Sequence, residues 1–152
     1  MKLAEALLLR ADLQKKIASL RERGVSNAVV QEGDEPHESP DALLKESFGA
    51  MEELEKLVIA INVANLTIKL PDGRTLTAAI AHRDTLAQRH SLLQAAIAGC
   101  RKDADRYGVR EIKWVSVLEV SKLQKQSDDL AKTLRELNGA IQQTNWEAEL
   151  GG

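Results

Sequence analysis

The sequence predicts an all-α protein of four helices, paired as two long antiparallel helical hairpins with coiled-coil-like packing. Aliphatic residues recur at alternating spacings of three and four along four long segments, which places them on one face of each helix. Aromatic residues make up only 3% of a chain that is 43% hydrophobic, so the core must be aliphatic. Such cores are typical of helices packed on helices. We therefore expect residues 1–152 to form a single elongated helical domain.

The first hairpin is expected over residues 2–65. Its first helix should run from about Lys2 to Arg23 and end at Gly24, because glycine is common just past a helix C-terminus. Residues 25–39 contain glycine, proline and an acidic run, and this composition predicts a loop.

The second helix of this hairpin has a clear start signal. Ser39 can accept a hydrogen bond from the first helical turn, and Pro40 suits the first helical position, where no N–H donor is needed. The helix should continue to about Asn62 or Asn65.

Residues 66–76 are expected to form a β-like connection between the hairpins. Two short strands, at 66–70 and 74–76, would flank a Pro-Asp-Gly turn at 71–73. A further extended segment could form at 112–115, where Ile, Trp and Val favour a strand.

The second hairpin is expected over residues 77–148. Its first helix should begin near Thr75 or Thr77 and end near Tyr107, just ahead of a glycine. Its second helix should cover residues 119–147. At about 1.5 Å per residue these helices reach roughly 40 Å, which is too long for one compact globule of this size.

The two hairpins resemble each other in sequence. The first helix matches the third after a shift of 73 residues, and the second matches the fourth after a shift of 80. The alternative is that any two leucine heptads can be superposed. Arginine, serine and asparagine interrupt the pattern at matching places, which favours an internal duplication. The matched pairs include Leu3 and Leu76, Ala6 and Ala79, Arg10 and Arg83, Leu13 and Leu86, Ser47 and Ser127, Ile61 and Ile141, and Asn65 and Asn145.

The second helix carries a second apolar stripe beside its seam. At the matching positions the fourth helix is mostly polar, with Gln124, Asp128, Ala131 and Asn138. We therefore expect the second helix to be buried on two sides, by its own hairpin and by another subunit, in a homo-oligomer. The stripe consists of Leu44, Phe48, Met51 and Val58.

Polar residues inside the seam form the candidate site. In an antiparallel hairpin the start of one helix lies beside the end of the next, so Arg10 should lie near Asn62 and Asn65, and Arg83 near Asn145. A buried guanidinium needs acceptors, which the asparagines or the neighbouring Asp12 and Asp84 could supply. We favour a polar layer that fixes helix register, and a small-ligand site at these residues is the alternative.

No residue pattern indicates catalysis, a cofactor or a metal. The acidic loop around His37 matches neither an EF-hand nor a zinc motif. His82 and His90 are eight residues apart, whereas a helical metal pair needs three or four. Cys100 is expected to be a small core residue. Trp114 and Trp146 should close the ends of the core, although such residues also mark interfaces.

Charge and composition narrow the partners and the compartment. The net charge of −2, from 21 basic and 23 acidic residues, gives no field that indicates nucleic acid or an anionic membrane. One cysteine allows no intrachain disulfide, and no stretch approaches the ~18 apolar residues of a membrane span. A cytoplasmic location is the default expectation.

Several segments, taken in order along nearly the whole chain, resemble the septicolysin-like family of small bacterial proteins. They are MKLAEALLLRADLQKKIASLRER at the start, VQEGDEP at 30–36, the Ile61-Asn62-x-x-Asn65 segment, LPDGRTLTAAIAHRD at 70–84, IKWV at 112–115 and TNWE at 144–147. The resemblance implies an elongated helical homo-oligomer and no defined activity. The family label suggests a cytolysin, but the chain has no basic amphipathic segment of the kind that binds membranes.

The sequence thus predicts an intracellular helical oligomer with a structural or interaction role and no enzymatic activity. A small-ligand binding module is the second hypothesis, and a membrane-active cytolysin is the third.

Overall fold

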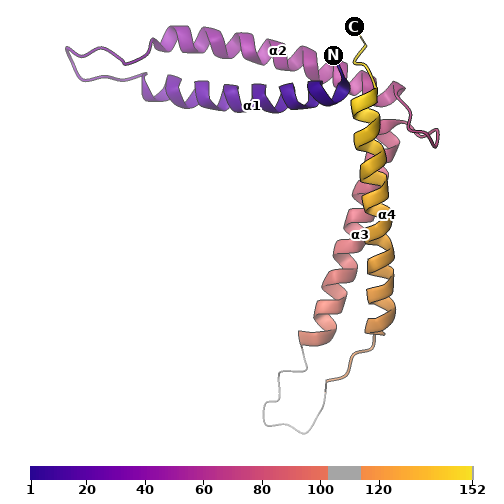
Figure 1. Cartoon of the computed structure of the whole chain (residues 1–152). Helices are drawn as coiled ribbons and strands as arrows, with labels where there is room; N and C mark the ends of the chain where they lie inside the picture. The colour runs from indigo at the N-terminus through magenta and orange to yellow at the C-terminus, as the bar shows by residue number, and fades with distance from the viewer. Residues whose placement is uncertain (103–113, 152) are drawn as a thin grey trace, which may run out of the picture. The chain divides into compact units, whose positions relative to one another are not determined.

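The computed structural model describes residues 1–102 and 114–151, and these residues form four α-helices and no strand. The helices are α1 (Leu3–Ser26), α2 (Pro40–Thr67), α3 (Leu76–Lys102) and α4 (Val120–Glu147). Helices α1 and α2 lie side by side and antiparallel, and so do α3 and α4 (Figure 1). The prediction of an all-α protein made of packed helices is confirmed.

The predicted seam forms the core of the α1–α2 hairpin. Leu3 and Ala6 are fully buried, and Leu20 and Ile61 are nearly so. Ser47 is buried among them without an unpaired hydroxyl, because its Oγ donates to the carbonyl of Leu43 at 2.8 Å. In the α3–α4 hairpin the buried residues include Leu76, Ala79, Leu86, Ile97, Ser127, Leu137 and Ile141.

Helix α1 ends later than its glycine predicts. It passes through Gly24 to Ser26, and Asn27 closes it by donating from its backbone N–H and its Nδ2 to the carbonyl of Arg23, at 3.1 and 2.9 Å. The Arg23 side chain is itself held by Glu38 from the far side of the loop. A tertiary ion pair and an asparagine cap therefore set the end of α1.

Helix α2 starts as predicted but continues past its predicted end. Ser39 Oγ accepts a hydrogen bond from the N–H of Ala42 at 3.4 Å, and Pro40 is the first helical residue. Thr67 is still helical, and its Oγ1 donates to the carbonyl of Val63 at 3.0 Å. The helix thus includes the first two residues of the predicted strand at 66–70.

The predicted β-hairpin at 66–76 is wrong. In its place one isolated antiparallel bridge joins Lys69 to Thr75. The turn between them is tight: Gly73 adopts a φ of 87°, which suits glycine, and its N–H donates to the carbonyl of Leu70 at 2.9 Å. Residues 68–75 lie between α2 and α3, and the turn at 71–73 leaves at most three residues on either side of it.

Part of the second connection lies outside the described residues. This is the case for the predicted end of α3 near Tyr107 and for residues 112–113 of the predicted segment 112–115. Trp114 and Val115 are described and have no regular structure.

The contacts divide the chain into two compact units, residues 1–68 with 144–152 and residues 69–143. Residues 144–147 of α4 therefore belong with the first hairpin. The prediction of a single domain over residues 1–152 stays a prediction.

The same backbone contacts recur at the beginning of α1 and at the beginning of α3. In the first unit Lys2 bridges to Glu149, and the N–H of Leu150 donates to the carbonyl of Met1 at 2.9 Å. In the second unit Lys69 bridges to Thr75, and the N–H of Leu70 donates to the carbonyl of Arg74 at 2.8 Å. The shifts of 73 and 80 convert one set of residues into the other. These recurring contacts support the predicted duplication.

This recurrence predicts that the chain tolerates circular permutation. A permutant would begin at Gly73, run to Leu150, continue through Pro-Asp-Gly in place of residues 151–152 into Met1, and end at Asp72. Because the new link copies the natural turn, we expect an unchanged circular dichroism spectrum and a thermal midpoint within about 5 °C of the parent. A matched permutant opened between Leu57 and Val58, inside α2, should not fold. Loss of helix in the first permutant would contradict the equivalence of the Lys2–Glu149 and Lys69–Thr75 contacts.

The contact between the chain ends also predicts a pH dependence. The ammonium of Lys2 and then that of Met1, at 2.7 and 3.2 Å from the Glu149 carboxylate, hold the pKa of Glu149 below its ordinary value of 4.5. A lowered folded-state pKa stabilises the fold above the unfolded value, and this stabilisation is lost as pH falls through the folded value.

Glu149→Gln should therefore lower the thermal midpoint at pH 7, and its difference from the parent should disappear as the solution becomes more acidic than pH 4.5. Glu22→Gln, at an exposed α1 carboxylate, serves as control and should change little at either pH. Thermal unfolding followed by circular dichroism measures both. A Glu149→Gln difference that is the same at all pH values would contradict the assignment.

Candidate functional site

The outer face of α2 exposes large apolar side chains. Leu44, Phe48 and Met51 have exposed fractions of 50, 59 and 45%, while Val58 is half-buried. Spacings of four and three place the first three on one face. We call Leu44, Phe48 and Met51 the α2 patch. It lies about 100° around the helix from the residues through which α2 packs on α1, namely Leu43, Ser47, Ala50, Leu57, Ile61 and Ala64.

The exposed apolar surface continues toward the end of α2. Ile59, Val63 and Leu66 are each more than half exposed. Ile59 and Val63 line a groove of about 430 Å³, and Glu149 forms another part of its wall. Sequence reasoning gave Val63 and Leu66 no role in an interface, because Leu66 was assigned to a strand. The continued helical spacing of 59, 63 and 66 was the available signal.

Helix α4 shows that the fold does not require apolar residues at these positions. Gln124 and Asp128 correspond to Leu44 and Phe48, and the Nε2 of Gln124 donates to Asp128 Oδ1 at 2.9 Å. The polar side chains thus satisfy each other along the helix. The apolar face that α2 exposes at these positions therefore has no counterpart on α4.

The predicted polar layer of the first hairpin is only partly buried. Arg10 and Asn65 are half-buried, and Asn62 is exposed. Among residues 1–102 and 114–151, no hydrogen bond joins Arg10 to either asparagine. A guanidinium that keeps contact with water needs no protein acceptor. The proposed register and ligand roles of these residues stay predictions.

The corresponding residues of the second hairpin have different environments. Arg83 donates to Asp84 Oδ1 through Nε at 3.0 Å and through Nη2 at 2.8 Å, so one of the acceptors expected from the sequence does bind it. Asn145 is buried, with an exposed fraction of 5%. Arg83 and Asn145 belong to different compact units, and a layer that includes both stays a prediction.

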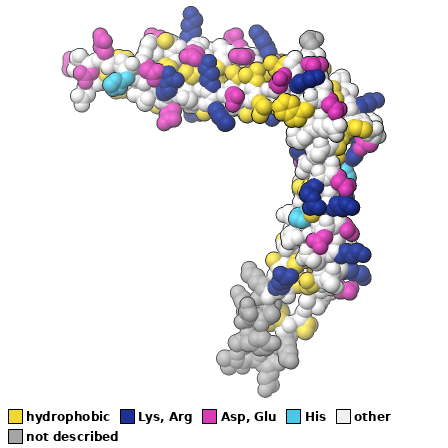
Figure 2. Space-filling model, viewed as in Figure 1, with side chains coloured by type: hydrophobic (Ala, Val, Ile, Leu, Met, Phe, Trp, Pro, Cys, Tyr) yellow, Lys and Arg dark blue, Asp and Glu magenta, His cyan; other side chains and the backbone are white. Residues whose placement is uncertain are grey.

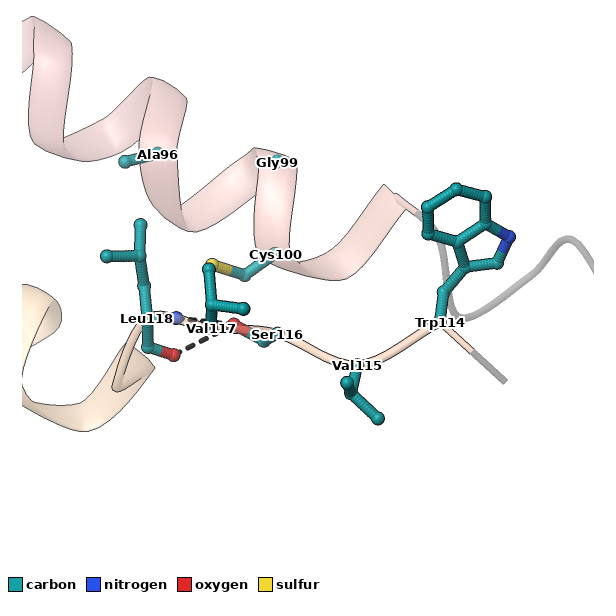
Figure 3. A pocket seen from close by; sticks show the side chains of 8 residues that line it. All are labelled: Ala96, Gly99, Cys100, Trp114, Val115, Ser116, Val117 and Leu118. Carbon is teal, nitrogen blue, oxygen red and sulfur yellow. Dashed lines mark hydrogen bonds between the residues drawn. The ribbon is translucent and has the colours of Figure 1, made fainter. Parts of the chain in front are cut away.

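A cavity of about 310 Å³ lies at the end of the second hairpin, between α3 and residues 114–118 (Figure 3). Ala96 and Gly99 contribute almost no side chain to its wall, and Cys100 is half-buried there. Ser116 Oγ donates to the carbonyl of Leu118 at 2.8 Å. The Trp114 ring lies away from Cys100 and is 71% exposed, so it leaves the cavity open.

This cavity offers one thiol and one hydroxyl that is already bound to the backbone. Its lining is partly polar, and its volume is at the lower end of the usual range for small-molecule sites. The sequence placed Cys100 in the core and Trp114 at the core's end. In the structure Cys100 is half-buried and Trp114 is largely exposed.

The acidic loop between α1 and α2 is held by an ion pair. Glu38 binds Arg23, and this hydrogen-bonded contact lowers the pKa of Glu38 and raises that of Arg23. Within the described residues, no three His, Cys, Asp or Glu side chains gather in a way that could hold a metal ion.

Charges of both signs are interspersed along both hairpins (Figure 2). Over the residues described, none of the helices combines the length and the apolar character needed to cross a bilayer. The resemblance to the septicolysin-like family and the cytoplasmic location stay predictions.

The chain is similar in structure to a functionally unknown conserved protein from Corynebacterium diphtheriae, known from its crystal structure. The two share 34% identity with a TM-score of 0.92, and the match covers 99% of each chain. No curated protein matches the chain at a significant level. The model of one protein family matches residues 10–150. The chain therefore belongs to the family of unknown function DUF6847.

Proposed function

We propose that the protein is a helical interaction protein, without catalytic activity, that associates with copies of itself through the α2 patch. The observation that carries this proposal is the half exposure of Leu44, Phe48 and Met51 on a helix whose other face is already packed. Exposed apolar patches of this kind mark protein interfaces, and aromatic residues often provide the anchor.

The contrast within the chain supports the same proposal. Gln124, Asp128 and Ala131 occupy the matching outer positions of α4, in a hairpin built on the same seam. Polar residues at these positions are therefore compatible with the fold. The apolar residues of α2 add nothing that the hairpin requires, so their role lies outside the hairpin.

The energy of such a contact is modest. Burying the exposed half of each side chain is worth roughly 1 kcal/mol, which gives about 6 kcal/mol for three residues from each of two copies. Association costs about 4–15 kcal/mol in lost freedom of motion. The patch alone therefore leaves at most about 2 kcal/mol, and a micromolar dissociation constant, which corresponds to about 8 kcal/mol, requires further contacts around it.

The test replaces Phe48 by Asp. We expect sedimentation velocity at about 50 μM to show the parent as a dimer or larger species, and Phe48→Asp as a 16.7 kDa monomer. The thermal midpoint should change little, because Phe48 is 59% exposed. Leu92→Asp is the matched control, since it puts the same charge on an exposed leucine of α3 and should leave the association intact. A parent protein that sediments as a monomer at this concentration would overturn the proposal.

A further inference from the structure

Two unpaired charges of opposite sign lie along the α2 patch. Lys45 and Glu52 are seven residues apart, which is nearly two helical turns, so both lie on the same flank of Phe48. Both side chains are exposed, and within the described residues neither takes part in an ion pair or a side-chain hydrogen bond. Each charge is thus available to a partner.

We infer that a second copy of this chain binds the α2 patch antiparallel, so that Lys45 of each copy faces Glu52 of the other. In a two-fold contact, if one residue meets a second, the second also meets the first. An antiparallel helix pair brings the same flank of both helices together. The single Lys45–Glu52 combination therefore provides two ion pairs in the dimer.

The register that pairs these charges also centres the apolar patch. The midpoint between residues 45 and 52 lies between Phe48 and Gly49, so the two Phe48 side chains lie next to the two-fold axis. Leu44 of one copy then lies within about a turn of Met51 of the other. Charge and apolar packing thus select the same alignment.

A parallel, in-register contact would not use these charges. It sets every residue level with its own copy, so Lys45 would lie level with Lys45 and Glu52 with Glu52. The charge pattern therefore favours the antiparallel orientation.

Helix α4 lacks this pattern of apolar and charged residues. The matching residues of α4 are Lys125 and Lys132, which carry the same sign and cannot form ion pairs with their own copies. The α4 residues that match Leu44 and Phe48 are already hydrogen-bonded to each other. A second copy is therefore matched by α2 in both apolar and charged residues, and by α4 in neither.

This inference rests on the proposed self-association, and a charge-reversal experiment separates the two. Lys45→Glu places two glutamates together at each contact, and Glu52→Lys places two lysines together. We expect each variant alone to associate about tenfold more weakly than the parent, since two surface ion pairs become two repulsions. An equimolar mixture restores both attractive pairs, so its weight-average mass in sedimentation equilibrium should return to that of the parent.

The double variant Lys45→Glu, Glu52→Lys should also associate like the parent, because its charges again complement those of its copy. Lys125→Glu and Lys132→Glu are the matched controls on α4 and should have no effect on association. If Phe48→Asp abolishes association but the mixture stays as weak as either variant, the antiparallel register is wrong and the α2 patch still stands. If the parent is a monomer, both proposals fail.

Discussion

The packing of each helix along one aliphatic seam is the constraint on which the structure depends. Leu3 and Ala6 are fully buried in the first hairpin, and their counterparts Leu76 and Ala79 are fully buried in the second. Small alanines next to leucines let paired helices approach closely. Because a hairpin buries only one face of each helix, the opposite face is free to vary, and that freedom is where α2 and α4 differ.

The ends of the hairpins show that a backbone contact can persist while its side chains change. Around the contact of Lys2 with Glu149, charged side chains bind each other directly at 2.7 Å. In the corresponding contact of Thr75 with Lys69, the ion pair is absent, and the adjacent turn is braced by Asp72, which accepts hydrogen bonds from Arg74. The backbone hydrogen bonds that close both ends are shared, so the main chain sets the geometry and the side chains only tune it.

Local signals in the sequence predicted the helices and their seam, and tertiary contacts account for most of what they missed. Ser39 and Pro40 marked the start of α2 correctly, because capping is a local interaction. Gly24 suggested the wrong end for α1, since Arg23 binds Glu38 on the far side of the loop. The sequence also could not predict how far the polar layer is buried: Arg10 occupies a heptad position, yet it is only half-buried.

The difference between α2 and α4 also bears on the specificity of association. An exposed Phe48 favours unspecific association, whereas its counterpart Asp128 opposes it. If the outer face had no partner, polar residues on α2 would serve the hairpin equally well, as they do on α4. A contact that must be specific needs a recognition element besides apolar area, and the opposite charges of Lys45 and Glu52 fix both orientation and register at little expense to the monomer.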